Sequence, residues 1–246
     1  MDGLVAVGGE LSSDSLNAAY RRGIFPWYSA DRGEPVLWWS PDPRTVLWVS
    51  NFKLSKSLSK TIRLWRAKDY SVRIDFDRAA VIKACAEMRH PRQASIEKND
   101  EKDETSVAGT WISQDIQSAY LAWQIDDKDE AQQSYAMHSV GVYNDNHLIG
   151  GFYGVGIGRM FFGESMFARE TDASKVALAC FILWAQAVGI DLIDCQQATR
   201  HLISLGATKI SRKQFEAAIQ ARIALPAIDW VAAAKLDLLR FNTETK

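Results

Sequence analysis

The feature that most constrains the fold is a strongly apolar helical pattern over residues 174–188 that runs directly into an apolar strand. Gly189 is placed to stop this helix, because glycine readily adopts the left-handed conformation found at helix C-termini. The strand that follows, 190–195, is interrupted only by Asp191 and Asp194. A helix and a strand joined this closely predict a β–α–β unit in the second half of the chain.

Strand patterns precede this unit. Residues 138–143 and 147–153 predict a β-hairpin across the Asn-Asp-Asn turn at 144–146, and 155–162 predicts a further strand. Adjacent antiparallel strands followed by β–α–β units are typical of a mixed α/β (α+β) fold. Helices are also expected at 12–23, 55–67, 77–88, 113–123, 212–223 and 228–241, and strands at 36–39, 45–48 and 70–74.

A change in composition at residues 52–68 marks the expected boundary between two domains. We expect a small N-terminal domain at 1–52 and a larger domain at 53–246. The chain has no run of about 18 apolar residues and no secretory signal, so we expect no membrane span and a cytoplasmic location. Its three cysteines lack CxxC spacing, which indicates neither a disulfide framework nor a zinc site.

The net charge of −1 is a cancellation between two blocks. Residues 53–92 hold eleven Lys or Arg against four acids, whereas 97–130 hold ten acids against three Lys. The basic block is either a solvated helix surface, the more common case, or a face that steers a polyanion.

Two acidic positions carry candidate chemistry. Glu164 lies in an aromatic and apolar run, so it either forms an internal salt bridge or binds a cationic substrate group. Asp194 ends the apolar strand two residues before Gln196, and carboxyl ends of strands are where α/β sheets bind ligands. Asp194 either orients an attacking amine together with Gln196 or caps a helix that follows Thr199.

Several other chemistries are not expected. The four histidines lack metal-ligand spacing, and neither GxSxG nor a Walker A motif occurs. The glycines at 154, 156 and 158 do not form GxGxxG, and strand rather than helix follows them, so no dinucleotide site is expected. We predict no metal.

Ten short motifs, each weak alone, follow one another in a fixed order that resembles bacterial leucyl/phenylalanyl-tRNA–protein transferases. They span most of the chain, at residues 3–11, 20–27, 37–44, 109–112, 138–140, 150–154, 162–167, 173–175, 192–196 and 201–207. The resemblance implies a small N-terminal domain followed by a GCN5-related N-acyltransferase-like domain. The acidic segments 97–104 and 126–133 look like insertions relative to that family.

The resemblance also implies an activity. Members of the family transfer Leu, Phe or, less often, Met from aminoacyl-tRNA to a protein whose N-terminal residue is Arg or Lys, which directs that protein to degradation. No coenzyme is implied, because the ester bond of aminoacyl-tRNA is already activated. A coenzyme A-dependent N-acetyltransferase and a non-catalytic tRNA-binding protein are the alternatives.

By resemblance, the site residues fall into four groups. Asp194 and Gln196 would engage the reacting amine, and Glu164 would hold substrate groups at the reaction centre. The tRNA 3′ end would bind Trp27, Trp111 and Tyr120. The aminoacyl side chain would enter a pocket lined by Phe152, Phe161, Leu178, Phe181 and Ile193. The tRNA phosphates would meet Lys56, Lys60, Arg63 and Arg66.

Overall fold

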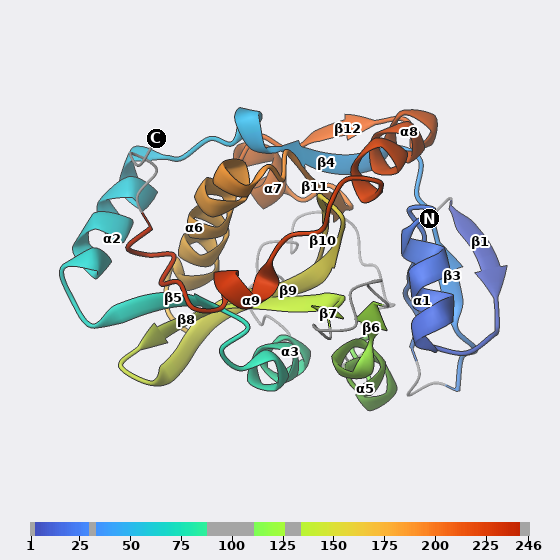
Figure 1. Ribbon diagram of the computed structural model, residues 1–246, viewed down its shortest axis with the longest axis horizontal. Helices are drawn as coiled ribbons and strands as arrows, with labels where there is room; N and C mark the ends of the chain where they lie inside the picture. Colours follow the sequence, from blue (N-terminus) through green and yellow to red (C-terminus); the bar gives the residue numbers. More distant parts are fainter. Residues whose placement is uncertain (1–2, 30–32, 88–110, 126–133, 242–246) are drawn as a thin grey trace, which may run out of the picture.

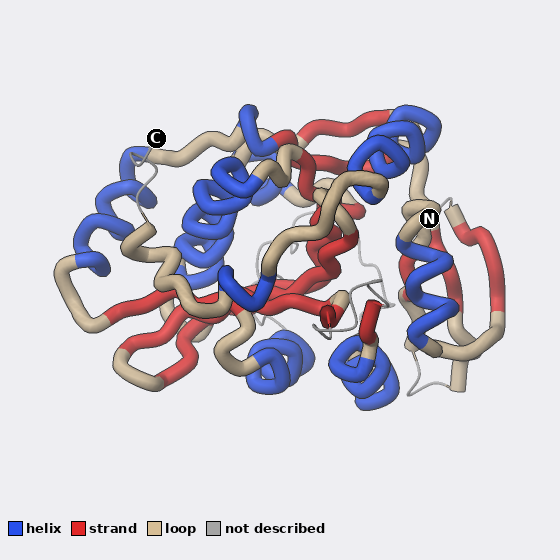
Figure 2. Tube along the Cα trace, in the orientation of Figure 1, coloured by secondary structure: helices blue, strands red, loops and turns tan. Residues whose placement is uncertain are grey.

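The computed structural model describes residues 3–29, 33–87, 111–125 and 134–241, and its centre is a seven-stranded mixed sheet (Figures 1 and 2). Only β10 and β11 pair in parallel, and every other neighbouring pair is antiparallel. The predicted mixed α/β class is thereby confirmed. In spatial order the strands are β12 (Thr208–Ile210), β4 (Arg44–Trp48), β11 (Leu192–Gln196), β10 (Met160–Ala168), β9 (His147–Ile157), β8 (Met137–Asn144) and β5 (Tyr70–Ile74).

The predicted hairpin is confirmed as β8 and β9, but the predicted strand 155–162 is wrong. The chain turns inside that segment, because β9 ends at Ile157 and β10 begins at Met160 as its antiparallel partner. Gly158 sits in the turn with a φ of 57°, and a Cβ there would lie 2.7 Å from the carbonyl oxygen of Arg222. This glycine was the available turn signal.

Helices cover both faces of the sheet (Figure 1). The helix α6 (Ala173–Val188) packs on one face and ends at Gly189, whose φ of 84° confirms the predicted stop. The opposite face is covered by α3 (Arg78–Glu87), α5 (Gln114–Ala122) and α8 (Arg212–Ile223). Two separate clusters of buried apolar side chains therefore lie on the two faces, as a three-layer arrangement requires.

A second, three-stranded sheet lies at the N-terminal end of the chain. Its strands are β1 (Leu4–Val7), β3 (Leu37–Trp39) and β2 (Phe25–Pro26), and α1 (Ser13–Tyr20) packs beside it, capped by Ser12. The next strand, β4, already belongs to the large sheet. The domain division predicted at residue 52 stays a prediction. Because β4 pairs within the large sheet, we propose a boundary at residues 40–43, between the two sheets.

The remaining elements are a basic helix and several short helices and strands. The basic helix α2 (Lys56–Arg66) is confirmed at the end of the molecule opposite α1, with Ser55 as its N-cap. The other short elements are η2 (Val49–Asn51), β6 (Gln124–Ile125), β7 (Ser134–Tyr135), α7 (Arg200–Ser204) and α9 (Trp230–Ala233).

The helix predicted at 228–241 is wrong beyond α9. The backbone N–H of Leu238 donates to the carbonyl of Val72 at 2.7 Å, and the N–H of Val72 donates to Asp237 Oδ1 at 2.9 Å. The segment thus satisfies the edge of β5 instead of continuing a helix. The acidic segments 97–104 and 126–133 lie outside the described residues. Within the described ranges, no helix has the length and hydropathy needed to span a bilayer.

The close approach of α6 to β9 gives a test of this packing. A methyl group added at Gly150 would overlap the Cβ of Ala173, so Gly150→Ala is expected to lower the free energy of unfolding by about 1–3 kcal/mol. The double variant Gly150→Ala/Ala173→Gly moves the methyl group across the contact and is expected to recover part of that loss. Urea unfolding measures both variants, and strictly additive losses would contradict the packing described.

Candidate active site

The candidate site lies where the two parallel strands of the large sheet separate. Strands β10 and β11 pair over three positions only, and the last pair is Phe162 with Asp194. Just beyond it, the pairing of β10 with β9 is irregular around Glu164, and the pairing of β11 with β4 is irregular around Cys195. Such bulges re-aim side chains next to functional sites. Here they bring Glu164 and Gln196 together across the opening between the strands.

A buried ion pair lies directly below this opening. Arg44 Nε and one terminal guanidinium nitrogen donate to the two carboxylate oxygens of Asp194, at 2.8 and 2.6 Å, and both side chains are at most 1% exposed. The guanidinium group of Arg44 also lies 4.8 Å from the ring centroid of Phe25 and 4.6 Å from that of Phe215. A two-point fork with aromatic neighbours is the geometry in which a buried pair of charges is tolerated.

Asp194 in turn holds Gln196. The backbone N–H of Gln196 donates to Asp194 Oδ1 at 2.9 Å, and Gln196 has a φ of 57°, in the left-handed region that costs a non-glycine residue energy. The side-chain Nε2 of Gln196 then donates to Glu164 Oε1 at 3.0 Å. The alternative in which Asp194 caps a helix is not realised, because Thr199 caps α7 with its own hydroxyl.

Glu164 is held by neutral groups. The hydroxyl of Tyr20, from α1, donates to Glu164 Oε1 at 2.6 Å, and the hydroxyl of Tyr120 lies 2.5 Å from that of Tyr20. Among the described residues no Lys, Arg or His nitrogen lies within 4 Å of this carboxyl, so the internal salt bridge considered for Glu164 is not formed there. The other carboxyl oxygen, Oε2, is shielded from solvent and has no protein partner.

This environment changes the acidity of Glu164. Burial raises the pKa of its carboxyl to about 8, and the neighbouring Asp194 raises it as well. The hydrogen bonds from Tyr20 and Gln196 and the charge of Arg44 act in the opposite direction. Burial also raises the pKa values of Tyr20 and Tyr120, so both hydroxyls keep their protons. Near neutral pH, Glu164 therefore carries a proton that it can donate through Oε2.

The five apolar residues predicted to line the aminoacyl pocket are brought together. They are all buried in the cluster beneath α6, namely Phe152, Phe161, Leu178, Phe181 and Ile193. The three phenylalanine rings contact one another with centroids 4.6–6.1 Å apart. Their role as a pocket stays a prediction.

The residues predicted for the tRNA 3′ end lie on the other face of the sheet. Trp27 and Trp111 are half-buried against that face's cluster, and the Trp27 ring meets Trp39 edge to face. Tyr120 is fully buried: its hydroxyl contacts that of Tyr20, and its ring packs against Trp123 and Tyr153. The four basic residues predicted to meet phosphates, Lys56, Lys60, Arg63 and Arg66, are all exposed on α2.

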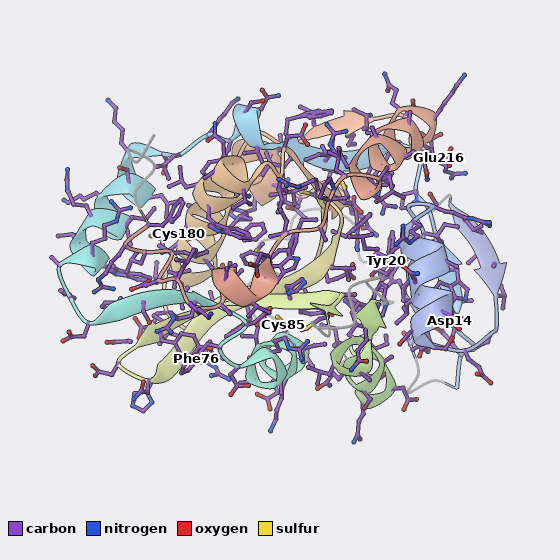
Figure 3. All side chains as sticks on the ribbon, in the orientation of Figure 1. Asp14, Tyr20, Phe76, Cys85, Cys180 and Glu216 are labelled. Atoms are coloured by element: carbon purple, nitrogen blue, oxygen red, sulfur yellow. The ribbon has the colours of Figure 1, made fainter. Side chains whose placement is uncertain are left out.

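Two site residues were missed from the sequence. Tyr20 falls within the helix predicted at 12–23, and nothing local marks its hydroxyl as the partner of a carboxyl group 144 residues away. Arg44 did carry a signal, because a charged residue that begins an apolar strand needs a buried partner. In Figure 3, Tyr20 lies on the side of α1 that faces the large sheet. Within the described part of the chain, no group of three His, Cys, Asp or Glu side chains is arranged to hold a metal ion.

Comparison with known proteins gives a consistent result. The family model "Leucyl/phenylalanyl-tRNA protein transferase" matches residues 46–220, and the model of the family's N-terminal domain matches 9–42. A leucyl/phenylalanyl-tRNA–protein transferase from Methylibium petroleiphilum is 50% identical over 93% of this chain and 78% of its own length. The corresponding proteins of Bordetella avium and Burkholderia orbicola are 47% and 45% identical over 93% of this chain, and over 84% and 81% of their own lengths.

These matches, together with a mixed sheet that opens at a half-buried acid–amide pair, define an aminoacyltransferase of the N-end rule pathway. The N-terminal family model ends before β4 and the main family model begins within β4. The two models therefore separate close to the boundary between the two sheets. The chain belongs to the leucyl/phenylalanyl-tRNA–protein transferase family. The relation of its large domain to the GCN5 fold stays a prediction.

The raised pKa of Glu164 predicts a pH dependence of stability. Between its ordinary pKa near 4.5 and its folded value of about 8, the folded state binds more protons than the unfolded state. The free energy of unfolding contributed by this group therefore falls as pH rises through that window. Glu164→Gln carries no titrating proton, so its stability should fall less between pH 5 and pH 8 than that of the wild type.

Chemical denaturation at several pH values measures this difference. The matched control is Glu216→Gln, at an exposed position, which should keep the wild-type pH dependence. Equal pH profiles for the wild type and Glu164→Gln would contradict the assignment of a raised pKa to Glu164.

Proposed function

We propose that this protein transfers Leu, Phe or, less often, Met from aminoacyl-tRNA to the N-terminal Arg or Lys of acceptor proteins and so marks them for degradation. The observation that carries the proposal is the contact between Glu164 and Gln196, supported by Asp194, in a chain whose relatives are named leucyl/phenylalanyl-tRNA–protein transferases. Because charged tRNA is the donor, we place this activity in the cytoplasm.

In the proposed reaction, the neutral α-amine of the acceptor attacks the aminoacyl ester carbonyl. The C–N bond of the new peptide forms, the C–O bond to the ribose breaks, and a proton passes from the amine to the departing ribose oxygen. Positioning of the two substrates supplies much of the rate, because the ester is already activated. The protein must therefore orient the amine, manage one proton and bind the end of the tRNA.

The contacts suggest separate tasks for the three polar residues. Gln196 can accept a hydrogen bond from the amine through Oε1, because its Nε2 is held by Glu164. Asp194 is fully buried and bonded to Arg44, so we assign it a positioning role, in which its Oδ1 fixes the backbone of Gln196. Glu164, protonated near neutral pH, offers Oε2 as a donor to the substrate groups.

The donor tRNA would be held at three places. Stacking of the 3′ adenosine on Trp27 and Trp111 would contribute about 1–3 kcal/mol per base. The apolar cluster beneath α6 would take up the aminoacyl side chain, with modest discrimination between side chains of about 1–3 kcal/mol per methylene. The exposed basic residues of α2 would contact phosphates, which makes binding sensitive to salt. Tyr120 would act through Tyr20 and Glu164 rather than by touching the tRNA.

A single-turnover assay tests the proposal. The wild type is expected to transfer labelled Leu or Phe from charged tRNA to a peptide that begins with Arg. Gln196→Ala should lower the transfer rate about 10²-fold, because the acceptor amine is no longer held in position at the ester, with little change in tRNA affinity. Gln186→Ala, which removes an exposed glutamine of α6, is the control and should keep the wild-type rate.

Three results would overturn the proposal. If the wild type binds tRNA without forming a peptide, the protein is a tRNA-binding protein. If it consumes acetyl coenzyme A instead, it is an N-acetyltransferase. If Gln196→Ala transfers at the wild-type rate, the assigned site is wrong.

A further inference from the structure

A groove separate from the candidate active site lies between α8 and the N-terminal sheet. Its volume is about 460 Å³, and neither Glu164 nor Gln196 lines it. Figure 1 shows α8 next to α1 and β1 at the end of the molecule opposite α2, and Figure 3 labels Glu216 on α8 there. The lining residues are Val5, Arg22, Ile24, Ser40, Arg212, Glu216 and Gln220. We call this feature the α8 groove.

Two buried polar atoms of the α8 groove have no hydrogen-bond partner in the described part of the chain. Ser40 is 3% exposed, and its Oγ forms no hydrogen bond. Arg212 Nε is also shielded from solvent and forms none. Buried donors without acceptors cost stability, and more than nine in ten buried polar groups in proteins find a partner. Two such atoms in one groove point to a ligand that supplies acceptors.

The charges of the groove favour an anion. Among the described residues, no carboxylate oxygen lies within 4 Å of the guanidinium nitrogens of Arg22 or Arg212. Glu216 follows Arg212 by one helical turn, the usual spacing for an ion pair, yet the two form none. Guanidinium groups with a hydroxyl beside them match the oxygens of a phosphate, which accept several hydrogen bonds at once.

The rest of the lining suits more than a bare phosphate. Glu216 opposes an isolated anion but can accept hydrogen bonds from ribose hydroxyls. Gln220 has its Nε2 bound to the carbonyl of Arg21, so its Oε1 is an acceptor as well. Val5 and Ile24 offer apolar surface to a base, and the volume lies in the range of small-ligand sites.

We propose that the α8 groove binds one nucleotide unit, with its phosphate on Arg22, Arg212 and Ser40 and its ribose on Glu216 and Gln220. This inference rests on the proposed function in one respect: we assign the nucleotide to the donor tRNA, which would then contact the protein at the α8 groove and at α2, at opposite ends of the molecule. A free mononucleotide has the same chemistry, and the experiment separates the two sources.

The experiment compares two double variants that each remove two positive charges. Arg22→Ala/Arg212→Ala empties the groove of its guanidinium groups. Lys209→Ala/Lys213→Ala removes two exposed lysines, one on β12 and one on α8, that do not line the groove. The binding of uncharged tRNA is measured at several salt concentrations, and the binding of adenosine monophosphate is measured by calorimetry.

The groove variant is expected to bind tRNA about tenfold or more weakly at about 0.1 M salt. The slope of log affinity against log salt should become smaller by about one, because the groove contacts one phosphate and each phosphate contact contributes close to one unit. The lysine variant should show neither change. This pattern, without binding of adenosine monophosphate, supports tRNA as the source. Binding of adenosine monophosphate that only the groove variant loses supports a free nucleotide.

Ser40→Ala separates a ligand role from a structural one. Replacing a buried hydroxyl that has no partner by a methyl-bearing side chain should leave the thermal midpoint equal to or above that of the wild type. The same variant should weaken nucleotide or tRNA binding severalfold. A purely structural hydroxyl would not produce this combination.

Two results overturn the inference. In the first, the groove and lysine variants bind tRNA and adenosine monophosphate equally well. In the second, only the KM for the Arg-initiated peptide rises, which would make the groove part of the acceptor site. If the wild type transfers aminoacyl groups and the first result is obtained, the inference about the groove is wrong and the proposed function still holds. If tRNA binding depends on the groove but no transfer occurs, the proposed function is wrong and the groove still binds tRNA.

Discussion

The buried ion pair between Arg44 and Asp194 is the interaction on which the rest of the site depends. Arg44 begins β4, Asp194 lies near the end of β11, and the rings of Phe25 and Phe215 bring β2 and α8 to the same guanidinium group. One pair of charges thus joins both sheets and a helix. Burying two charges is costly, and here the fork geometry and the aromatic neighbours offset part of the desolvation, while Arg44 Nη1 has no acceptor among the described residues.

The same pair also positions the other polar side chains of the candidate site. Asp194 uses an oxygen already bonded to Arg44 to hold the backbone of Gln196 in its left-handed conformation. Gln196 then reaches Glu164, which Tyr20 holds from the other side of the opening. Since Tyr20 belongs to α1, the N-terminal unit contributes directly to the site. Loss of the N-terminal unit would remove the hydrogen bond from Tyr20 to Glu164 and would also expose apolar surface.

Sequence patterns correctly predicted those elements whose formation depends on residues close by in the sequence. The helix α6 and its stop at Gly189, the β8–β9 hairpin and the basic helix α2 all follow from periodicity and capping residues. The strand predicted at 155–162 failed because the turn at Gly158 interrupts an apolar run without any polar residue before it. The helix predicted at 228–241 failed because the edge of β5, far away in sequence, competes for its backbone hydrogen bonds.

The site was predictable in its residue types but not in its connections. Glu164 stands out as an acid within an apolar run and Gln196 as an amide that follows an apolar strand, and the structure brings them within 3.0 Å. The partners Arg44 and Tyr20 lie 150 and 144 positions away from Asp194 and Glu164, and no spacing rule links them. The engagement of the amine by Asp194 stays a prediction, and the bonds of Asp194 to Arg44 and to the backbone of Gln196 support the positioning role that we propose for it.

A double-mutant cycle across the ion pair tests this account most directly. Arg44→Met and Asp194→Leu are each expected to lower the free energy of unfolding by about 3–5 kcal/mol, because each leaves one buried charge unpaired. The double variant should recover much of that loss but should still transfer aminoacyl groups poorly, since Gln196 has lost its backbone acceptor. Losses that add to within about 0.5 kcal/mol, or a double variant with wild-type transfer, would contradict it.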